Sequence, residues 1–84
     1  MIKHSYKVTK QISFTPHLAA AFVQMTEKYQ SRILLESGNK KANGKSLMGM
    51  VSIGIEQGAE ITFIVDGPDQ DLALEGIIEF FDEA

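Results

Sequence analysis

A serine that follows lysines stands at the predicted start of a short helix in the middle of the chain. Ser46 comes directly after Gly44 and Lys45, and Lys40 and Lys41 lie a few residues earlier. The free backbone N–H groups and the positive dipole end of a helix N-terminus favour an anion. A phosphate on Ser46 would add about −1.5 to −2 charges, offset by that terminus and by Lys45. The segment is therefore a suitable place for a phosphoserine, although the composition alone favours the alternative that Ser46 only caps the helix.

The same segment is similar to the phosphate-binding loop of nucleotide hydrolases, which also ends in Gly-Lys-Ser. Five residues separate Gly38 from Gly44 here, one more than that loop allows. A chain of 84 residues is also too short for such a domain. We therefore exclude a nucleotide site.

The helix predicted after Ser46 is apolar on two sides. At about 100° per residue, Met50 and Ile53 fall together and can face a sheet, whereas three other apolar side chains point elsewhere. These are Leu47, Met48 and Val51. One sheet cannot cover both sides, so we expect Leu47 and Val51 to be exposed in a monomer and to bind a protein partner. The alternative is that a neighbouring loop covers them.

Candidate catalytic residues are few. His17 lies in the first turn of a helix predicted to begin at Thr15-Pro16, where a histidine could carry a phosphoryl group on nitrogen or simply be an exposed polar residue. His4, the other histidine, lies on a strand face and is predicted to be structural. The sequence shows no carboxylate pair, serine–histidine–aspartate set or metal-ligand spacing. We expect no enzyme activity, no metal and no cofactor.

The composition indicates one small domain. The chain has 84 residues, a net charge of −3, 44% hydrophobic residues and no cysteine. Packing must stabilise it without disulfides, which suits a cytoplasmic protein. No segment resembles a signal peptide or the roughly 18-residue apolar run of a membrane span, and the mild acidity argues against direct nucleic-acid binding. Residues 67–84 carry six acids and no base, whereas the lysines gather near Ser46.

The predicted elements follow the order β-α-β-β-α-β-α, which indicates an α+β open-faced sandwich. The expected strands are residues 2–9, 32–36, 40–43 and 60–66. The expected helices begin at three N-caps: Thr15, Ser46 and Asp69. Their expected apolar stripes are Leu18, Phe22, Met25 and Tyr29 in the first helix and Ala73, Leu74, Ile77, Ile78 and Phe81 in the last.

Residues 45–54, with the sequence KSLMGMVSIG, resemble the regulatory-serine segment of HPr, the small phosphocarrier protein of the bacterial sugar phosphotransferase system. The element order and length match that family over about residues 5–82, and residues 58–62 continue the match. The resemblance implies a single domain over residues 1–84, with a four-stranded antiparallel sheet and three helices on one face.

The family's phosphocarrier motif is altered in this chain. The motif corresponds to residues 13–19, in which Thr15 stands at the position of the family's phosphorylated histidine and His17 at that of its arginine. A threonine phosphate ester is far less labile than a phosphohistidine and would not pass its phosphoryl group onward. Shifting the register by two places His17 in the active position but puts Ala19 where the arginine belongs.

The resemblance is closest to the catabolite-repression HPr-like proteins of Gram-positive bacteria, which also lack the active histidine. It implies that HPr kinase/phosphorylase modifies Ser46 and that the phosphoprotein is a corepressor for a LacI-type catabolite-control transcription factor. The partner-binding residues would be His17, Lys45, Leu47, Met48 and Val51. Two alternatives stay open: a phosphocarrier that receives phosphate at His17 from enzyme I, and a diverged HPr-like domain that binds something unrelated.

Overall fold

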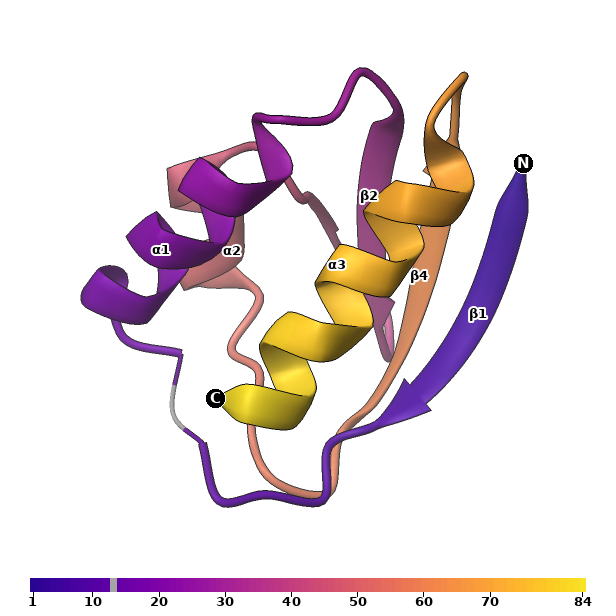
Figure 1. Cartoon of the computed structure of the whole chain (residues 1–84). Coiled ribbons are helices and arrows are strands. Elements are labelled where there is room, and N and C mark those ends of the chain that lie inside the picture. Colours follow the sequence, from indigo (N-terminus) through magenta and orange to yellow (C-terminus); the bar gives the residue numbers. More distant parts are fainter. Residues whose placement is uncertain (13) are drawn as a thin grey trace.

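The computed structural model of the chain describes residues 1–12 and 14–84, and its strands and helices follow the predicted order (Figure 1). The elements are β1 (Ile2–Lys7), α1 (Pro16–Thr26), β2 (Arg32–Ser37), β3 (Lys40–Asn43), α2 (Leu47–Ser52), β4 (Glu60–Asp66) and α3 (Gln70–Glu83). Only the first strand departs clearly from its expected bounds, because it ends at Lys7 rather than at residue 9. Beyond it, Val8 still exchanges backbone hydrogen bonds with Gly58 and Ala59.

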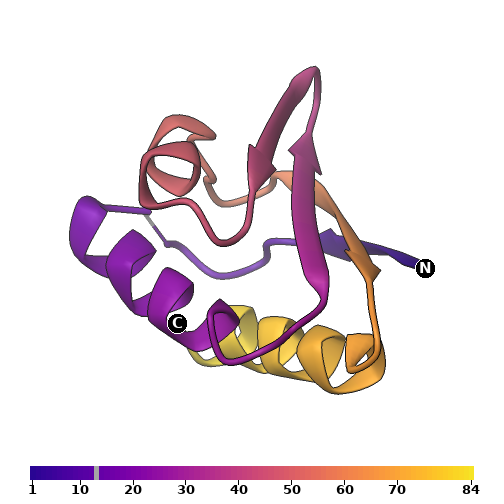
Figure 2. The ribbon, with the colours of Figure 1, turned by 90° about the horizontal axis from the view of Figure 1, so that it is seen from above.

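The strands form one antiparallel sheet in the order β1-β4-β2-β3. In the central pair, Leu35 lies opposite Phe63, and Ile33 lies opposite Val65. These residues are buried on the side that faces α1 and α3, and Figure 2 shows that these two helices lie beside each other on that side. None of the helices in the described part of the chain lies over the other side of the sheet. The predicted α+β open-faced sandwich is therefore confirmed.

Aromatic side chains fill the space between the sheet and the helices. Phe22 from α1, Phe63 from β4 and Phe81 from α3 are almost completely buried. Phe81 contacts both others, with ring centroids 5.7 Å from Phe22 and 5.4 Å from Phe63. Edge-to-face and tilted pairs at these distances add to the hydrophobic stabilisation of the core. One aromatic cluster thus joins α1, α3 and the sheet.

The predicted stripe of the first helix packs against the core, but only one of its members is fully buried. Phe22 is buried as expected, whereas Leu18, Met25 and Tyr29 are half-buried against the core. The other buried side chains of the helix are Ala19, Val23 and Thr26. The reason is that α1 packs against both α2 and α3. A helix contacted on two sides needs small residues between its large ones. In α3, likewise, three members of the predicted stripe are buried and two are half-buried against the core: Ala73, Ile77 and Phe81, and Leu74 and Ile78.

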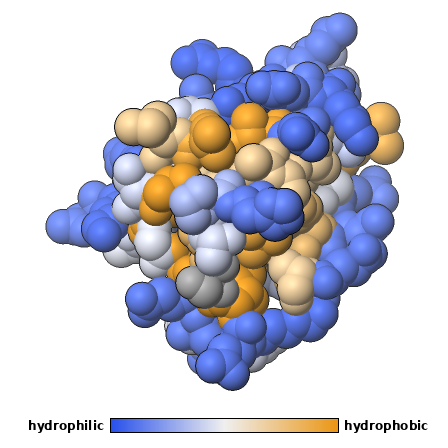
Figure 3. Space-filling model, turned by 90° about the vertical axis from the view of Figure 1, so that its left-hand side faces the viewer, coloured by the Kyte–Doolittle hydropathy of each residue, from blue (hydrophilic) through white to orange (hydrophobic). Residues whose placement is uncertain are grey.

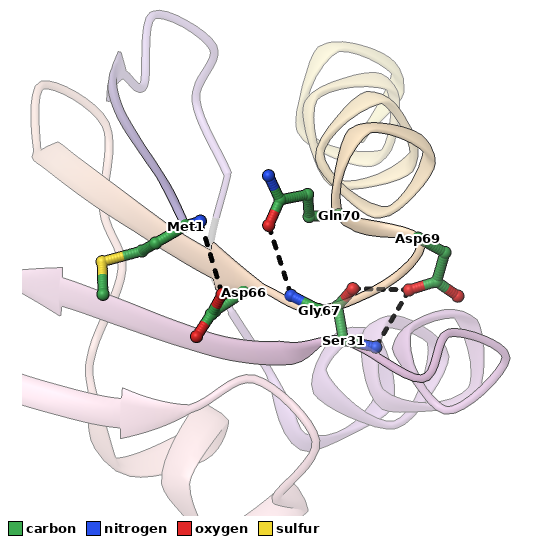
Figure 4. A network of polar contacts seen from close by, with 6 residues as sticks. All are labelled: Met1, Ser31, Asp66, Gly67, Asp69 and Gln70. Carbon is green, nitrogen blue, oxygen red and sulfur yellow. Dashed lines mark hydrogen bonds and ion pairs between the residues drawn. The ribbon is translucent and has the colours of Figure 1, made fainter.

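Two local predictions hold only in part. His4 lies opposite Phe63 on the core-facing side of β1, and its ring stacks on that of Phe63 with 6.5 Å between centroids, but the side chain is exposed because β1 is an edge strand. Asp69 is the N-cap residue of α3, as predicted, but its side chain makes no cap hydrogen bond. Its carboxylate instead points to the loop between α1 and β2, where Ser31 donates to it (Figure 4). Within the described residues, no helix is long and apolar enough to cross a membrane.

Candidate functional site

Ser46 is the N-cap of α2, as predicted. Its Oγ accepts a hydrogen bond from the backbone N–H of Gly49 at 3.1 Å, and its carbonyl accepts one from Met50 at 3.0 Å. A Cβ on Gly49 would lie 3.4 Å from Ser46 Oγ, in van der Waals contact with it. The side chain is half-buried and remains partly accessible to solvent.

The loop that presents Ser46 is held from both sides. Asn43 accepts two hydrogen bonds, one from Lys45 N at its side-chain oxygen and one from Ser46 N at its carbonyl. Gly44 donates to the Ile33 carbonyl at 2.8 Å and accepts from the Thr26 hydroxyl at 2.8 Å. A Cβ on Gly44 would lie 2.5 Å from an Ile33 methyl group. This close packing fixes where Ser46 lies.

The three lysines near Ser46 in sequence are directed to different places. Lys45 Nζ donates to the carbonyl of Tyr29, beyond the end of α1. Lys41 Nζ lies 3.6 Å from a carboxylate oxygen of Glu36 on β2. Lys40 Nζ lies near Gly54, after α2. The three lysines that gather near Ser46 in the sequence therefore have different neighbours in the fold, because adjacent residues of a strand point to opposite faces and Lys45 lies beyond the hairpin.

The two sides of α2 differ as its sequence predicts. Met50 and Ile53 are 0% and 3% exposed and belong to the core, whereas Leu47, Met48 and Val51 are 45%, 78% and 38% exposed. We call these three exposed residues the docking patch. The predicted exposure of Leu47 and Val51 is confirmed. Figure 3, which views the side of the molecule that carries α1 and α2, shows apolar side chains in the middle and hydrophilic ones around them.

Thr15 and His17 are both exposed at the start of α1. Thr15 is the N-cap, with Pro16 at the first helical position, and its Oγ1 accepts from the backbone N–H of Leu18 at 3.2 Å. Because α1 packs against α2, both helices contribute to the same side of the molecule. Ser13, which begins the compared motif, lies outside the described residues.

Two polar contacts link residues far apart in the sequence, and sequence reasoning missed both. Asp69 accepts from the backbone of Gln30 and Ser31 at 2.9 Å each and from the Ser31 hydroxyl. The Tyr6 hydroxyl donates to Asp82, and burial, followed by this bond, raises the pKa of Tyr6 to about 12. No local sequence pattern could have revealed pairs separated by 38 and 76 residues. Among residues 1–12 and 14–84, no group of three or more carboxylates and histidines could hold a metal.

The chain is similar to proteins of one family over almost its whole length. The family profile described as "PTS HPr component phosphorylation site" matches residues 2–83. The HPr-like protein Crh of Halalkalibacterium halodurans is 35% identical over 83 residues, which cover 99% of each chain. The crystal structure of HPr-C-His from Thermoanaerobacter tengcongensis matches with a TM-score of 0.87 at 30% identity, covering 98% of this chain and 92% of that one. The crystal structure of Crh, a Bacillus subtilis catabolite-repression protein with a swapped domain, matches with a TM-score of 0.77 at 34% identity, covering 99% and 95%.

Proposed function

Because the chain belongs to the HPr family, we propose that it is a regulatory protein of the bacterial sugar phosphotransferase and carbon catabolite repression system. Phosphorylation of Ser46 switches it, and it acts in the cytoplasm through contact with other proteins. The similarity to two Crh proteins, one of them a catabolite-repression protein, supports this assignment.

The observation that carries the proposal is the position of Ser46 directly before the docking patch. The serine caps α2, and the next residues of the same helix include the exposed Leu47, Met48 and Val51. A phosphate at this cap lies at the positive end of the helix dipole and provides strong acceptor oxygens. A partner then meets a charged group and an apolar surface together. Arginine side chains and an apolar pocket are the complementary features that it would need.

The proposed partners are HPr kinase/phosphorylase, which modifies Ser46, and a LacI-type catabolite-control transcription factor, which binds the phosphoprotein. His17 is exposed and available to a partner on the side of α1. Lys45 is tied to the Tyr29 carbonyl, so in this proposal it supports the serine loop and offers its remaining N–H donors. The protein itself contacts neither nucleic acid nor membrane.

Thr15 argues against a role as a phosphocarrier. A carrier needs a phosphoramidate that passes its phosphoryl group to the next protein, whereas a threonine forms a stable ester. The Thr15 hydroxyl is also engaged in the N-cap of α1. Transfer through His17 is the alternative, because its imidazole is exposed in the first turn of that helix.

Paired phosphorylation tests the switch. The protein is incubated with ATP and HPr kinase, or with phosphoenolpyruvate and enzyme I, and the phosphate is then mapped by mass spectrometry. We expect a label on Ser46 in the first reaction only. Ser46→Ala should abolish it, and Ser52→Ala, at an exposed serine of the same helix, should not. Acid-labile label on His17 would establish the carrier alternative, and no label in either reaction would indicate a diverged binding domain.

The docking patch is tested by binding of the phosphorylated protein to the transcription factor. Met48→Lys places a charge at a residue that is 78% exposed, and Leu72→Lys makes the same change on α3 at a residue that is 62% exposed. We expect Met48→Lys to weaken binding by at least about tenfold and Leu72→Lys to leave it unchanged. Equal effects of both substitutions would contradict the assignment of the patch.

A further inference from the structure

The side of the sheet that no helix covers contains a hollow of about 410 Å³. Figure 2 shows this open side opposite α1 and α3. Leu34 and Ile64, which lie opposite each other on β2 and β4, line the hollow and are only half-buried. The volume falls within the range of about 300–1,000 Å³ in which proteins bind small molecules.

Cationic side chains lie beside the apolar surface that Leu34 and Ile64 form in the hollow. Arg32 at the start of β2 and Lys45 after β3 both line the hollow, as does the amide-bearing Asn43. Arg32 makes no ion pair and no side-chain hydrogen bond with any described residue. It lies opposite Asp66 in the strand register, yet the Asp66 carboxylate pairs with the Met1 amine at 3.3 Å instead (Figure 4). An arginine without a partner beside a hollow is available to an incoming anion.

The charge around the hollow is opposite to that of the chain as a whole. Arg32 and Lys45 contribute two positive side chains against one negative side chain, Asp66, in a protein whose net charge is −3. The planar guanidinium can bind two oxygens of a phosphate or carboxylate at once. Lys45 uses one N–H donor on the Tyr29 carbonyl, and an ammonium group has three.

We propose that this hollow binds a small oxyanion with an apolar body, whose charged end pairs with Arg32 and Lys45 and whose body lies on Leu34 and Ile64. A phosphomonoester of an aromatic or branched aliphatic alcohol has this chemistry. The site lies on the uncovered side of the sheet and does not include the docking patch. Its argument does not rest on the function proposed for Ser46, although the two share Lys45 and the loop of residues 43–46.

Titration with phenyl phosphate, followed by the amide NMR signals of residues 32–34 and 64, tests the proposal. We expect saturable shifts of these signals in the intact chain. Arg32→Gln should weaken binding by at least about tenfold. The matched control is Lys7→Gln, because Lys7 is an exposed cation at the far end of the same sheet and does not line the hollow.

Two comparison ligands separate the charge from the apolar body. Inorganic phosphate has the charge alone and phenol the ring alone, so each should bind much more weakly than phenyl phosphate. The proposal fails if phenyl phosphate gives no saturable shift, or if Arg32→Gln and Lys7→Gln weaken it equally. It also fails if inorganic phosphate or phenol binds as tightly as phenyl phosphate. Unchanged amide spectra of both variants away from the substituted residue establish that they are folded.

Discussion

The carboxylate of Asp69, at the start of α3, accepts both the backbone N–H of Ser31, at 2.9 Å, and the Ser31 hydroxyl (Figure 4). Ser31 is completely buried, and it precedes β2. A Cβ on Gly67 would lie 2.5 Å from Ser31 Cα, so the two chain segments are in close contact here. This contact fixes the first turn of α3 against the loop that leads from α1 into the sheet.

Protonation of Asp69 should make the free energy of unfolding decrease at acidic pH. Hydrogen bonds from Ser31 and then from Gln30 lower the pKa of Asp69 below its ordinary value of 3.8. The resulting stabilisation is complete above that ordinary value and is lost as the pH falls through the lower folded-state value. Urea unfolding between pH 7 and pH 2 should therefore show a smaller loss of stability in Asp69→Asn than in the wild type. Asp71→Asn, at an exposed acid in the first turn of the same helix, should retain the wild-type profile.

The phenol of Tyr6 should ionise at an unusually high pH. Burial, the hydrogen bond to Asp82 and the charge of Asp82 together raise its pKa to about 12 from 10.0. Because the folded state favours the neutral phenol, this stabilisation is complete below pH 10 and is lost as the pH rises toward 12. In Tyr29→Phe, where Tyr6 is the remaining tyrosine, ultraviolet absorbance should show ionisation at a higher pH in the folded protein than in urea. Adding Asp82→Asn should move the transition part of the way back, because the burial of Tyr6 remains; an unmoved transition would contradict the contribution of Asp82.

The two sides of α2 should respond differently to truncation. Met50 is completely buried and Met48 is 78% exposed. Met50→Ala leaves a cavity and should lower the free energy of unfolding by about 2–4 kcal/mol, whereas Met48→Ala should change it by less than about 0.5 kcal/mol. Urea denaturation with equal m-values measures both. A large loss in Met48→Ala would mean that its side chain is covered in solution.

The cap at Ser46 should contribute to stability before any phosphorylation. Ser46→Ala removes the acceptor for the Gly49 N–H and should cost about 1 kcal/mol, whereas Ser46→Asp retains an acceptor and should cost little. Thermal unfolding of both variants provides the comparison, with Ser52→Ala as the control. If Ser46→Ala unfolds like the wild type, the observed cap does not stabilise the protein, and the effect of a phosphate there must be explained without it.

Local patterns in the sequence determined the element order, the caps at Thr15 and Ser46 and the two-sided character of α2. Each of these depends on residues two to four positions apart, because a strand alternates every second residue, a cap bonds to the next helical turn and a stripe repeats with the helical period. The family resemblance was likewise carried by a contiguous segment, residues 45–54. Such features can be predicted from a short segment because they do not depend on contacts with distant parts of the chain.

The tertiary structure alone decided which distant groups meet. The Asp69 carboxylate accepts a hydrogen bond from Ser31 instead of capping its own helix, and the Lys45 ammonium donates to the Tyr29 carbonyl. His4 is exposed because it lies on an edge strand. A charged side chain has several possible partners within a compact domain, and the strand order selects among them. The hollow beside Arg32 on the uncovered face of the sheet has the same origin, because it forms only once β2 and β4 are paired and α1 and α3 lie on the other side.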